Sequence, residues 1–156
     1  MQRKITQRIG TSNIDWPAAT HPVLKQIYSS RKIFSAKELD YSLSNLSSFE
    51  SLENINQAVA LLADIIEKDI YSLIVSDYDA DGATACALAI RGMTSMGISN
   101  VEYLVPDRFK HGYGLSPAVV ELALDLNPDV IITVDNGISS IDGVALARSN
   151  GIDVII

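Results

Sequence analysis

The chain has 156 residues, of which 47% are hydrophobic and 20% are charged, and its formal net charge is −7. This composition is typical of a globular protein with one core of ordinary size and a short appendage. The negative charge argues against a strong nucleic-acid groove within these residues, because neutralising a phosphate backbone needs clustered Lys and Arg. Charges interrupt the apolar runs and no leader pattern opens the chain, so we predict no membrane or targeting segment. The single cysteine, Cys86, cannot form an internal disulfide and favours a cytoplasmic location.

The first 50 residues are predicted to be a tail followed by short helices. The opening 20 residues have no apolar periodicity, whereas helical spacing begins near Val23. Ser35 stands where it can cap a short helix over residues 36–41. A second domain is expected over residues 51–156. It opens with an amphipathic helix that ends near Lys68, and the apolar stripe of this helix comprises Ile55, Ala58, Val59, Leu62, Ile65 and Ile66.

After Lys68, short apolar runs alternate with helical segments, which is the pattern of a parallel α/β sheet. Strands are predicted over residues 71–76, 101–105 and 130–134 and from residue 154 onward. Helices are predicted over residues 83–96, from Ser116 with Pro117 in the first turn, and over residues 140–149. Each connection is long enough for a right-handed crossover, so the predicted fold is a doubly wound, mainly parallel sheet preceded by a small helical segment. The last predicted strand reaches Ile156 without a turn, so we expect the chain to stop inside the domain.

Three carboxylates, Asp77, Asp79 and Asp81, stand at alternate positions directly after the first predicted strand. Such a cluster repels itself unless cations neutralise it, and carboxylate oxygens suit Mg²⁺ or Mn²⁺. The spacing also opens an EF-hand loop, but Leu88 occupies the twelfth position where a bidentate Glu is required. The simpler alternative is a solvated acidic turn that caps the next helix, a role for which one acid would suffice.

A fourth acid, Asp135, follows the third predicted strand, so two strand ends would present carboxylates to one crevice. The following Asn136-Gly137 pair is typical of a tight hairpin, but a helical segment comes next and disfavours that reading. From the residues alone, membership of Asp135 in a metal site and an ordinary turn remain equally good alternatives.

The loop over residues 106–114 combines cations with glycines. Arg108 and His111 can meet an anion, and Gly112 and Gly114 allow close backbone approach. The loop does not match a dinucleotide-binding fingerprint, because Pro117 occupies the third glycine position. Its alternatives are a phosphate-binding loop, with Arg108 as the first candidate ligand, and an ordinary exposed loop.

Three segments together resemble the first motifs of the RecJ exonucleases, a branch of the DHH phosphoesterase family. They are SDYDADGATA at residues 76–85, VPDRFKHGYGLSPA at residues 105–118 and VIITVDNGISSI at residues 130–141. The resemblance covers nearly the whole chain from about residue 15, and it implies that residues 51–156 are part of a DHH domain. It also implies roles for individual residues. The implied metal ligands are Asp77, Asp79, Asp81 and Asp135, of which Asp79, Asp81 and Asp135 are catalytic; the implied phosphate contacts are Arg108, His111, Gly112, Tyr113, Gly114 and Asn136.

The resemblance further implies a reaction, which is 5′-to-3′ degradation of single-stranded DNA in repair and recombination with two Mn²⁺ or Mg²⁺ ions as cofactors. The implied partners are single-stranded DNA, a single-strand-binding protein and a helicase. The family also needs an Asp-His-His motif, which this chain lacks, so the chain alone is expected to be inactive. Val75 stands where some members have a metal-binding His.

Two other functions remain as alternatives. A DHH phosphodiesterase of short oligonucleotides or cyclic dinucleotides would share the same motifs. A signalling receiver domain also places acids after its first strand and an Asp after its third, but it normally has an adjacent acid pair and no helical lead-in. A folded segment that binds without catalysing is a third possibility, which we expect for the chain by itself.

Overall fold

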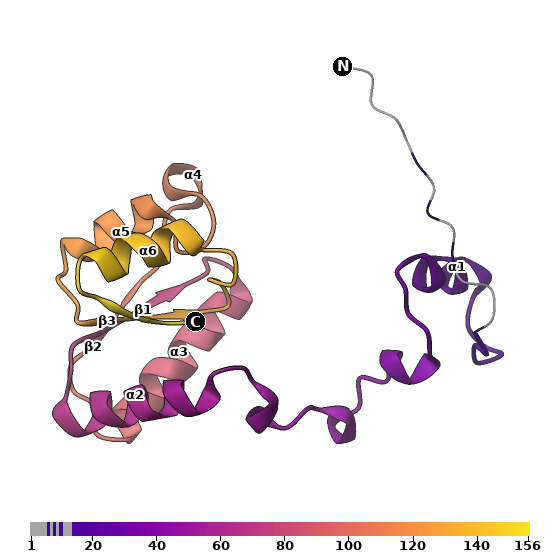
Figure 1. The fold of residues 1–156 in the computed structure, drawn as a ribbon, viewed down its shortest axis with the longest axis horizontal. Helices are drawn as coiled ribbons and strands as arrows, with labels where there is room; N and C mark the ends of the chain where they lie inside the picture. The colour runs from indigo at the N-terminus through magenta and orange to yellow at the C-terminus, as the bar shows by residue number, and fades with distance from the viewer. Residues whose placement is uncertain (1–5, 7, 9, 11–13) are drawn as a thin grey trace, which may run out of the picture. The chain divides into compact units, whose positions relative to one another are not determined.

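The computed structural model describes residues 6, 8, 10 and 14–156, and the chain divides into two compact units. The first unit ends at Leu52, and the second runs from Glu53 to Ile156. Figure 1 shows the second unit as a layered α/β structure and the first as a series of short helices.

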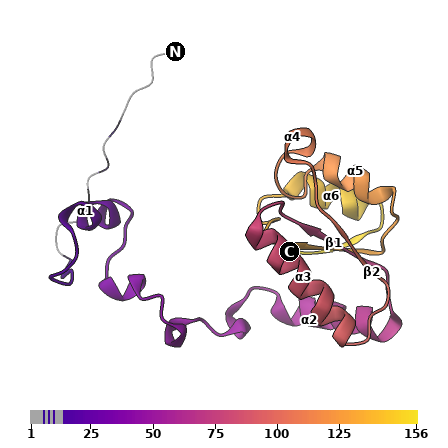
Figure 2. The same ribbon diagram turned by 180° about the vertical axis from the view of Figure 1, so that it is seen from behind.

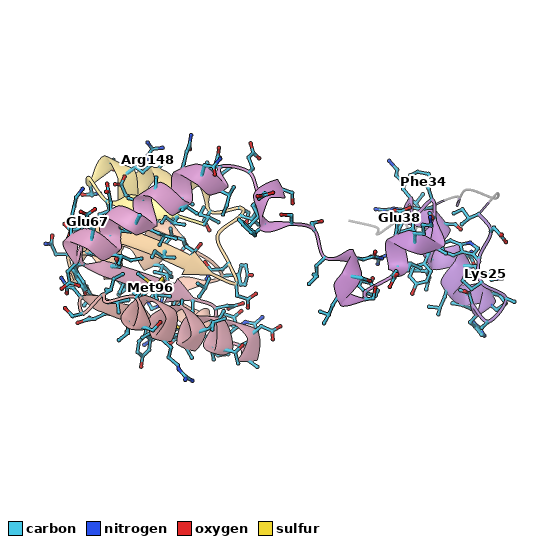
Figure 3. All side chains as sticks on the ribbon, turned by 90° about the horizontal axis from the view of Figure 1, so that it is seen from below. Lys25, Phe34, Glu38, Glu67, Met96 and Arg148 are labelled. Carbon is cyan, nitrogen blue, oxygen red and sulfur yellow. The ribbon has the colours of Figure 1, made fainter. Side chains whose placement is uncertain are left out.

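The first unit contains short helices only. They are α1 (Pro22–Ser30) and three 3₁₀ helices, η1 (Ala36–Leu39), η2 (Leu43–Asn45) and η3 (Phe49–Ser51). Ser35 caps η1 as predicted, in a capping box in which the Glu38 carboxylate accepts the Ser35 N–H at 2.8 Å. The helix ends at Leu39, two residues earlier than predicted, because Asp40 is extended. None of these helices contains a buried residue, and Figure 3 shows Lys25, Phe34 and Glu38 projecting from this unit.

A four-stranded parallel sheet forms the centre of the second unit, in the order β2-β1-β3-β4. Its strands are β1 (Ser72–Ser76), β2 (Val101–Leu104), β3 (Val130–Val134) and β4 (Asp153–Ile155). Each observed boundary lies within two residues of the sequence-based prediction. Every residue of β1 is buried, which explains why this strand reads as a short apolar run rather than an alternating one.

Helices cover both faces of the sheet, so the predicted doubly wound fold is confirmed (Figures 1 and 2). The helices are α2 (Ile55–Lys68), α3 (Ala80–Ser95), α4 (Arg108–His111), α5 (Pro117–Leu124) and α6 (Ile141–Ser149). Residues of α2 and α3 pack with Ile74 in one core, and residues of α5 and α6 pack with Leu73 and Val75 in the other. Cys86 belongs to the first core, where it packs as a small apolar side chain. Among the described residues, no helix combines the length and apolarity needed to cross a bilayer.

A glycine in α6 lets this helix approach the segment that precedes α5. A Cβ atom placed on Gly143 would lie 1.8 Å from the carbonyl oxygen of Leu115. That contact is with backbone, so relieving it requires the helix to move. Gly92 lies in α3, but a Cβ there would meet nothing within 4 Å.

Alanine substitution at these two helical glycines should therefore have opposite effects. We expect Gly143→Ala to lower the free energy of unfolding by about 2 kcal/mol or more, through the forced displacement of α6. Gly92→Ala should raise it by about 0.5 to 1 kcal/mol through helix propensity. Urea unfolding followed by circular dichroism measures both values, and an equal response at the two sites would contradict the packing described for α6.

One carboxylate joins the end of α2 to the turn that leads into β2. Asp69, which caps α2 in the left-handed conformation at φ +48°, accepts hydrogen bonds from the N–H groups of Ser99 and Asn100 and from the Ser99 hydroxyl. The Ser99 hydroxyl and these N–H groups lower the pKa of Asp69. The ionised form therefore stabilises the folded state.

The contribution of Asp69 should depend on pH in a defined direction. Because its folded pKa is lowered, the contribution is present at neutral pH and is lost as the pH falls below about 4. Asp69→Asn keeps a residue that tolerates positive φ, so it should melt below wild type at pH 7 and match it in acid. Glu67, which projects from α2 without a hydrogen bond among the described residues (Figure 3), provides the control Glu67→Gln. Thermal melts across the pH range should show convergence for the first variant only.

Candidate metal centre

The site lies where the winding of the sheet reverses. The chain passes from β1 to β2 through α3 on one face, and from β2 to β3 through α5 on the other face. β1 and β3 are nevertheless neighbours, and Ser76 at the end of β1 pairs with Val134 at the end of β3. The loops that follow these two strands therefore leave the sheet at the same level, between diverging helices. In open α/β sheets this is the position of the ligand-binding crevice.

Three of the four predicted acids meet in this crevice. Carboxylate oxygens of Asp77, Asp79 and Asp135 all lie within 4.8 Å of one another. Asp77 is buried, with 7% of its surface exposed, and its Oδ1 accepts the N–H of Tyr78 at 2.7 Å. Asp81 lies outside this group, so its role as a metal ligand stays a prediction.

Asp79 caps the next helix, which is the role that the simpler alternative in the sequence analysis gave to an acid of this turn. Its Oδ1 accepts the N–H groups of Asp81 and Gly82, each at 3.0 Å, and so caps α3. This cap explains why α3 begins at Ala80, three residues before the predicted start, and why Asp81 lies in the first helical turn. A Cβ on Gly82 would lie 2.3 Å from the carbonyl oxygen of Asp77, so only glycine allows the helix this close to the strand end.

The loop after β3 holds Asp135 in an uncommon backbone conformation. Asp135 has φ +60°, in the left-handed region, which Asp and Asn tolerate better than most residues. The Asn136 side-chain NH₂ donates to the carbonyl oxygens of Val75 at 3.2 Å and Val134 at 3.0 Å, and so clamps the ends of β1 and β3 together. Both amide hydrogens are engaged, which leaves none for a phosphate in this arrangement. The buried Asn136 Oδ1 has no hydrogen-bond partner among the described residues.

The electrostatics of the crevice favour cations. Partial burial raises the pKa of Asp135, and the charges of Asp79, Asp81 and Asp77 raise it further. Burial likewise raises the pKa of Tyr113, and three of these acids add to the effect. The converging oxygens are hard ligands of the type that Mg²⁺ and Mn²⁺ take. The residues present therefore fit a divalent ion.

The cationic segment over residues 106–114 contains a short helix, whereas the sequence analysis predicted a loop. The helix is α4, which Asp107 caps by accepting the Phe109 N–H at 2.9 Å. His111 Nδ1 accepts the Asp107 N–H at 3.1 Å, which fixes the imidazole ring against the start of the helix. Gly112 and Gly114 have φ values of +76° and +73°, so the turn that follows α4 depends on glycine.

Two contacts attach this segment to the acidic crevice. The guanidinium carbon of Arg108 lies 5.0 Å from the ring centroid of Tyr78, within cation–π distance. The Tyr113 hydroxyl donates to the carbonyl oxygen of Asp135 at 3.3 Å. The structure thus brings the predicted phosphate-binding segment beside the predicted metal ligands. Their contacts with phosphate remain a prediction.

Two positioning residues were missed by the sequence analysis. The Tyr78 ring makes a cation–π contact with Arg108. An aromatic residue between two acids could have indicated such a contact. The Ser140 hydroxyl accepts the Leu115 N–H at 3.0 Å and so links the two glycine-containing loops. No local pattern could have identified Ser140, because its partner is 25 residues away.

A pocket of about 300 Å³ adjoins the acids on the α3 side. Its lining is mainly small or apolar, and no Lys or Arg is among its residues. The cations nearest the crevice are therefore those of the α4 segment. The lining consists of Ser76, Asp77, Tyr78, Ala83, Cys86, Ala87, Ile90, Tyr103 and Val105.

A parallel sheet with acids at its switch point is the arrangement of a cation-binding α/β domain, and comparison with known families identifies the class. Residues 72–156 match the family model described as the DHH family, N-terminal domain. The chain belongs to the DHH family. The sheet, the acids of the crevice and the α4 segment all lie within the matched residues.

Relatives of the chain include the single-stranded-DNA-specific exonucleases RecJ of Salmonella typhimurium and Escherichia coli. Each is 43% identical over 155 residues, a match that covers 99% of this chain and 27% of the relative. Among solved structures, exonuclease RecJ bound to manganese has a TM-score of 0.59 at 32% identity and covers 66% of this chain and 26% of that one. The resemblance to RecJ is therefore confirmed, and the chain spans about a quarter of the length of these relatives.

Removing one charge from the crevice should change how stability responds to metal. Asp135→Asn keeps a residue suited to positive φ and removes a carboxylate whose pKa is raised by its neighbours. We expect this variant to melt higher than wild type in chelator at neutral pH. With free Mn²⁺ at about 100 times its dissociation constant, wild type should gain about 2.7 kcal/mol, and the variant much less.

The matched control is Asp153→Asn, which alters an exposed acid at the opposite end of the sheet. It should respond to Mn²⁺ as wild type does. Equal metal responses of Asp135→Asn and wild type in differential scanning calorimetry would exclude Asp135 from a metal centre.

Proposed function

We propose that this chain forms the metal-binding part of a 5′-to-3′ single-stranded DNA exonuclease that acts in repair and recombination. The convergence of Asp77, Asp79 and Asp135 at the switch point, beside a segment that carries Arg108, is the observation that supports this proposal most directly. The relatives support this substrate, since both are exonucleases specific for single-stranded DNA.

Each group in the crevice has a proposed role. Asp77, Asp79 and Asp135 would hold a divalent ion, and Asp81 would complete the set for a second one. When bound, Mn²⁺ or Mg²⁺ supplies Lewis-acid stabilisation of phosphate oxygens and lowers the pKa of a water molecule. Arg108 would bind the substrate phosphate and orient it, with the Tyr78 ring restricting the guanidinium to one side of the crevice.

His111 and the backbone of residues 112–114 would add further contacts to phosphate. The ring of His111 is already fixed through Nδ1, so its other nitrogen is available to a ligand. The Tyr113 hydroxyl donates to the Asp135 carbonyl and so holds this loop beside the metal ligands. We further propose a cytoplasmic location and partnership with a single-strand-binding protein and a helicase, in line with the resemblance to RecJ.

A chimera tests the proposal directly. The matched segment of the Escherichia coli relative would be replaced by this chain, and nucleotide release from labelled single strands would be measured with Mn²⁺. We expect activity in the chimera and none in the 156-residue chain alone. Asp135→Asn should lower the activity of the chimera by about a hundredfold or more, whereas Asp153→Asn should leave it unchanged.

The choice of substrate separates this proposal from the alternative DHH activity. Release of nucleotides from the 5′ end of long single strands is expected. If the chimera with its Mn²⁺ bound hydrolysed only short oligonucleotides or cyclic dinucleotides, the phosphodiesterase alternative would replace the exonuclease. An inactive chimera that still binds Mn²⁺ and DNA would contradict both activities.

A further inference from the structure

One aromatic side chain near the crevice has no role in the proposed chemistry. Phe109 is 96% exposed, more than any other large hydrophobic residue among those the structure describes. A phenylalanine normally buries its ring, whereas this one is exposed on a helix that Asp107 caps through the Phe109 N–H. Figures 1 and 2 both show α4 standing clear of the two helical layers, so neither layer covers it.

The position of Phe109 is defined by its neighbours. Arg108 stacks on Tyr78, which lies between two of the converging acids, and Tyr113 bonds to the Asp135 backbone. The segment that presents Phe109 is thus attached to both sides of the candidate metal centre. A molecule that reaches the metal ligands past α4 would therefore pass the exposed ring.

The charges around the ring indicate what kind of molecule this is. Phe109 stands between Arg108 and Lys110, in a chain whose net charge is −7. Arg108 makes no ion pair with a carboxylate among the described residues, and Lys110 forms a solvent-exposed ion pair with Asp107 at 3.7 Å. Adjacent cations and a bare aromatic face are the two components with which proteins bind single-stranded nucleic acid, one for phosphates and one for bases.

We propose that Phe109 stacks on a base of single-stranded DNA while Arg108 and Lys110 contact the flanking phosphates. This inference rests on the proposed function for the substrate class, and it adds a residue that selects single strands. Bases in a duplex are stacked on each other and cannot offer a face to Phe109. Every base has such a face, so the contact is independent of sequence.

The test compares two labelled oligonucleotides of equal length, one of thymidine nucleotides and one abasic throughout, by fluorescence anisotropy with the 156-residue chain. Both carry the same phosphates, so the difference in affinity isolates the bases. Wild type should prefer the thymidine strand, and Phe109→Leu should lower the affinity for that strand by about tenfold, a typical loss for one stacked base. Its affinity for the abasic strand should not change.

The matched control is Phe49→Leu, which alters a phenylalanine that is 69% exposed but flanked by Ser48 and Glu50 instead of cations. It should keep the full preference for bases. A second readout uses Phe109→Trp in a Trp16→Phe background, so that the only indole is at the site. Its fluorescence should be quenched by the thymidine strand and not by the abasic strand.

Several results would overturn the inference. They are equal binding of both strands by wild type, no binding of either strand, an unchanged preference in Phe109→Leu, and an equal loss for both strands in that variant. Calorimetric titration with Mn²⁺ separates the two proposals: intact Mn²⁺ binding without base preference removes the role of Phe109 alone, whereas absent Mn²⁺ binding removes the basis of the proposed function.

Discussion

The pairing of β1 with β3 is the interaction on which the site depends. These strands are separated in the chain by a complete crossover through β2, yet they lie side by side in register from Ser72 and Val130 to Ser76 and Val134. Parallel neighbours end at the same edge of a sheet, so the residues that follow them must meet. The Asn136 amide strengthens this junction, because it bonds to the carbonyl oxygens at the ends of both strands.

The junction of β1 and β3 also brings negatively charged carboxylates close enough to repel one another. Packing of the sheet and capping of α3 hold carboxylates close together at the edge of the sheet, where Asp77 is buried and Asp79 and Asp135 are exposed. The raised pKa of Asp135 expresses the cost of this arrangement without a cation. Stability of the fold thus makes the crevice receptive to positive charge, and the same groups that would bind a metal restrict how stable the metal-free chain can be.

The α4 segment forms the other side of the crevice and carries positive charge. The short helix α4 is attached to the acids by a cation–π contact and a hydrogen bond, not by packing into either core. Its cations and its exposed ring therefore remain available to a ligand. The two sides of the crevice therefore have different proposed roles. The sheet edge positions the metal ligands, and the α4 segment provides the surface that would contact the rest of the substrate.

The sequence by itself determined the fold class and most of the acidic site. Apolar runs that alternate with helical segments have few solutions other than a doubly wound parallel sheet, and loops after its strands carry the ligands. Tertiary structure alone decided which acids converge and how Asn136 clamps the ends of β1 and β3 together. These features rest on contacts between residues distant in the chain, which no local pattern encodes. The exposure of Phe109 was likewise decided by the tertiary structure, because the sequence pattern of an aromatic residue predicts burial.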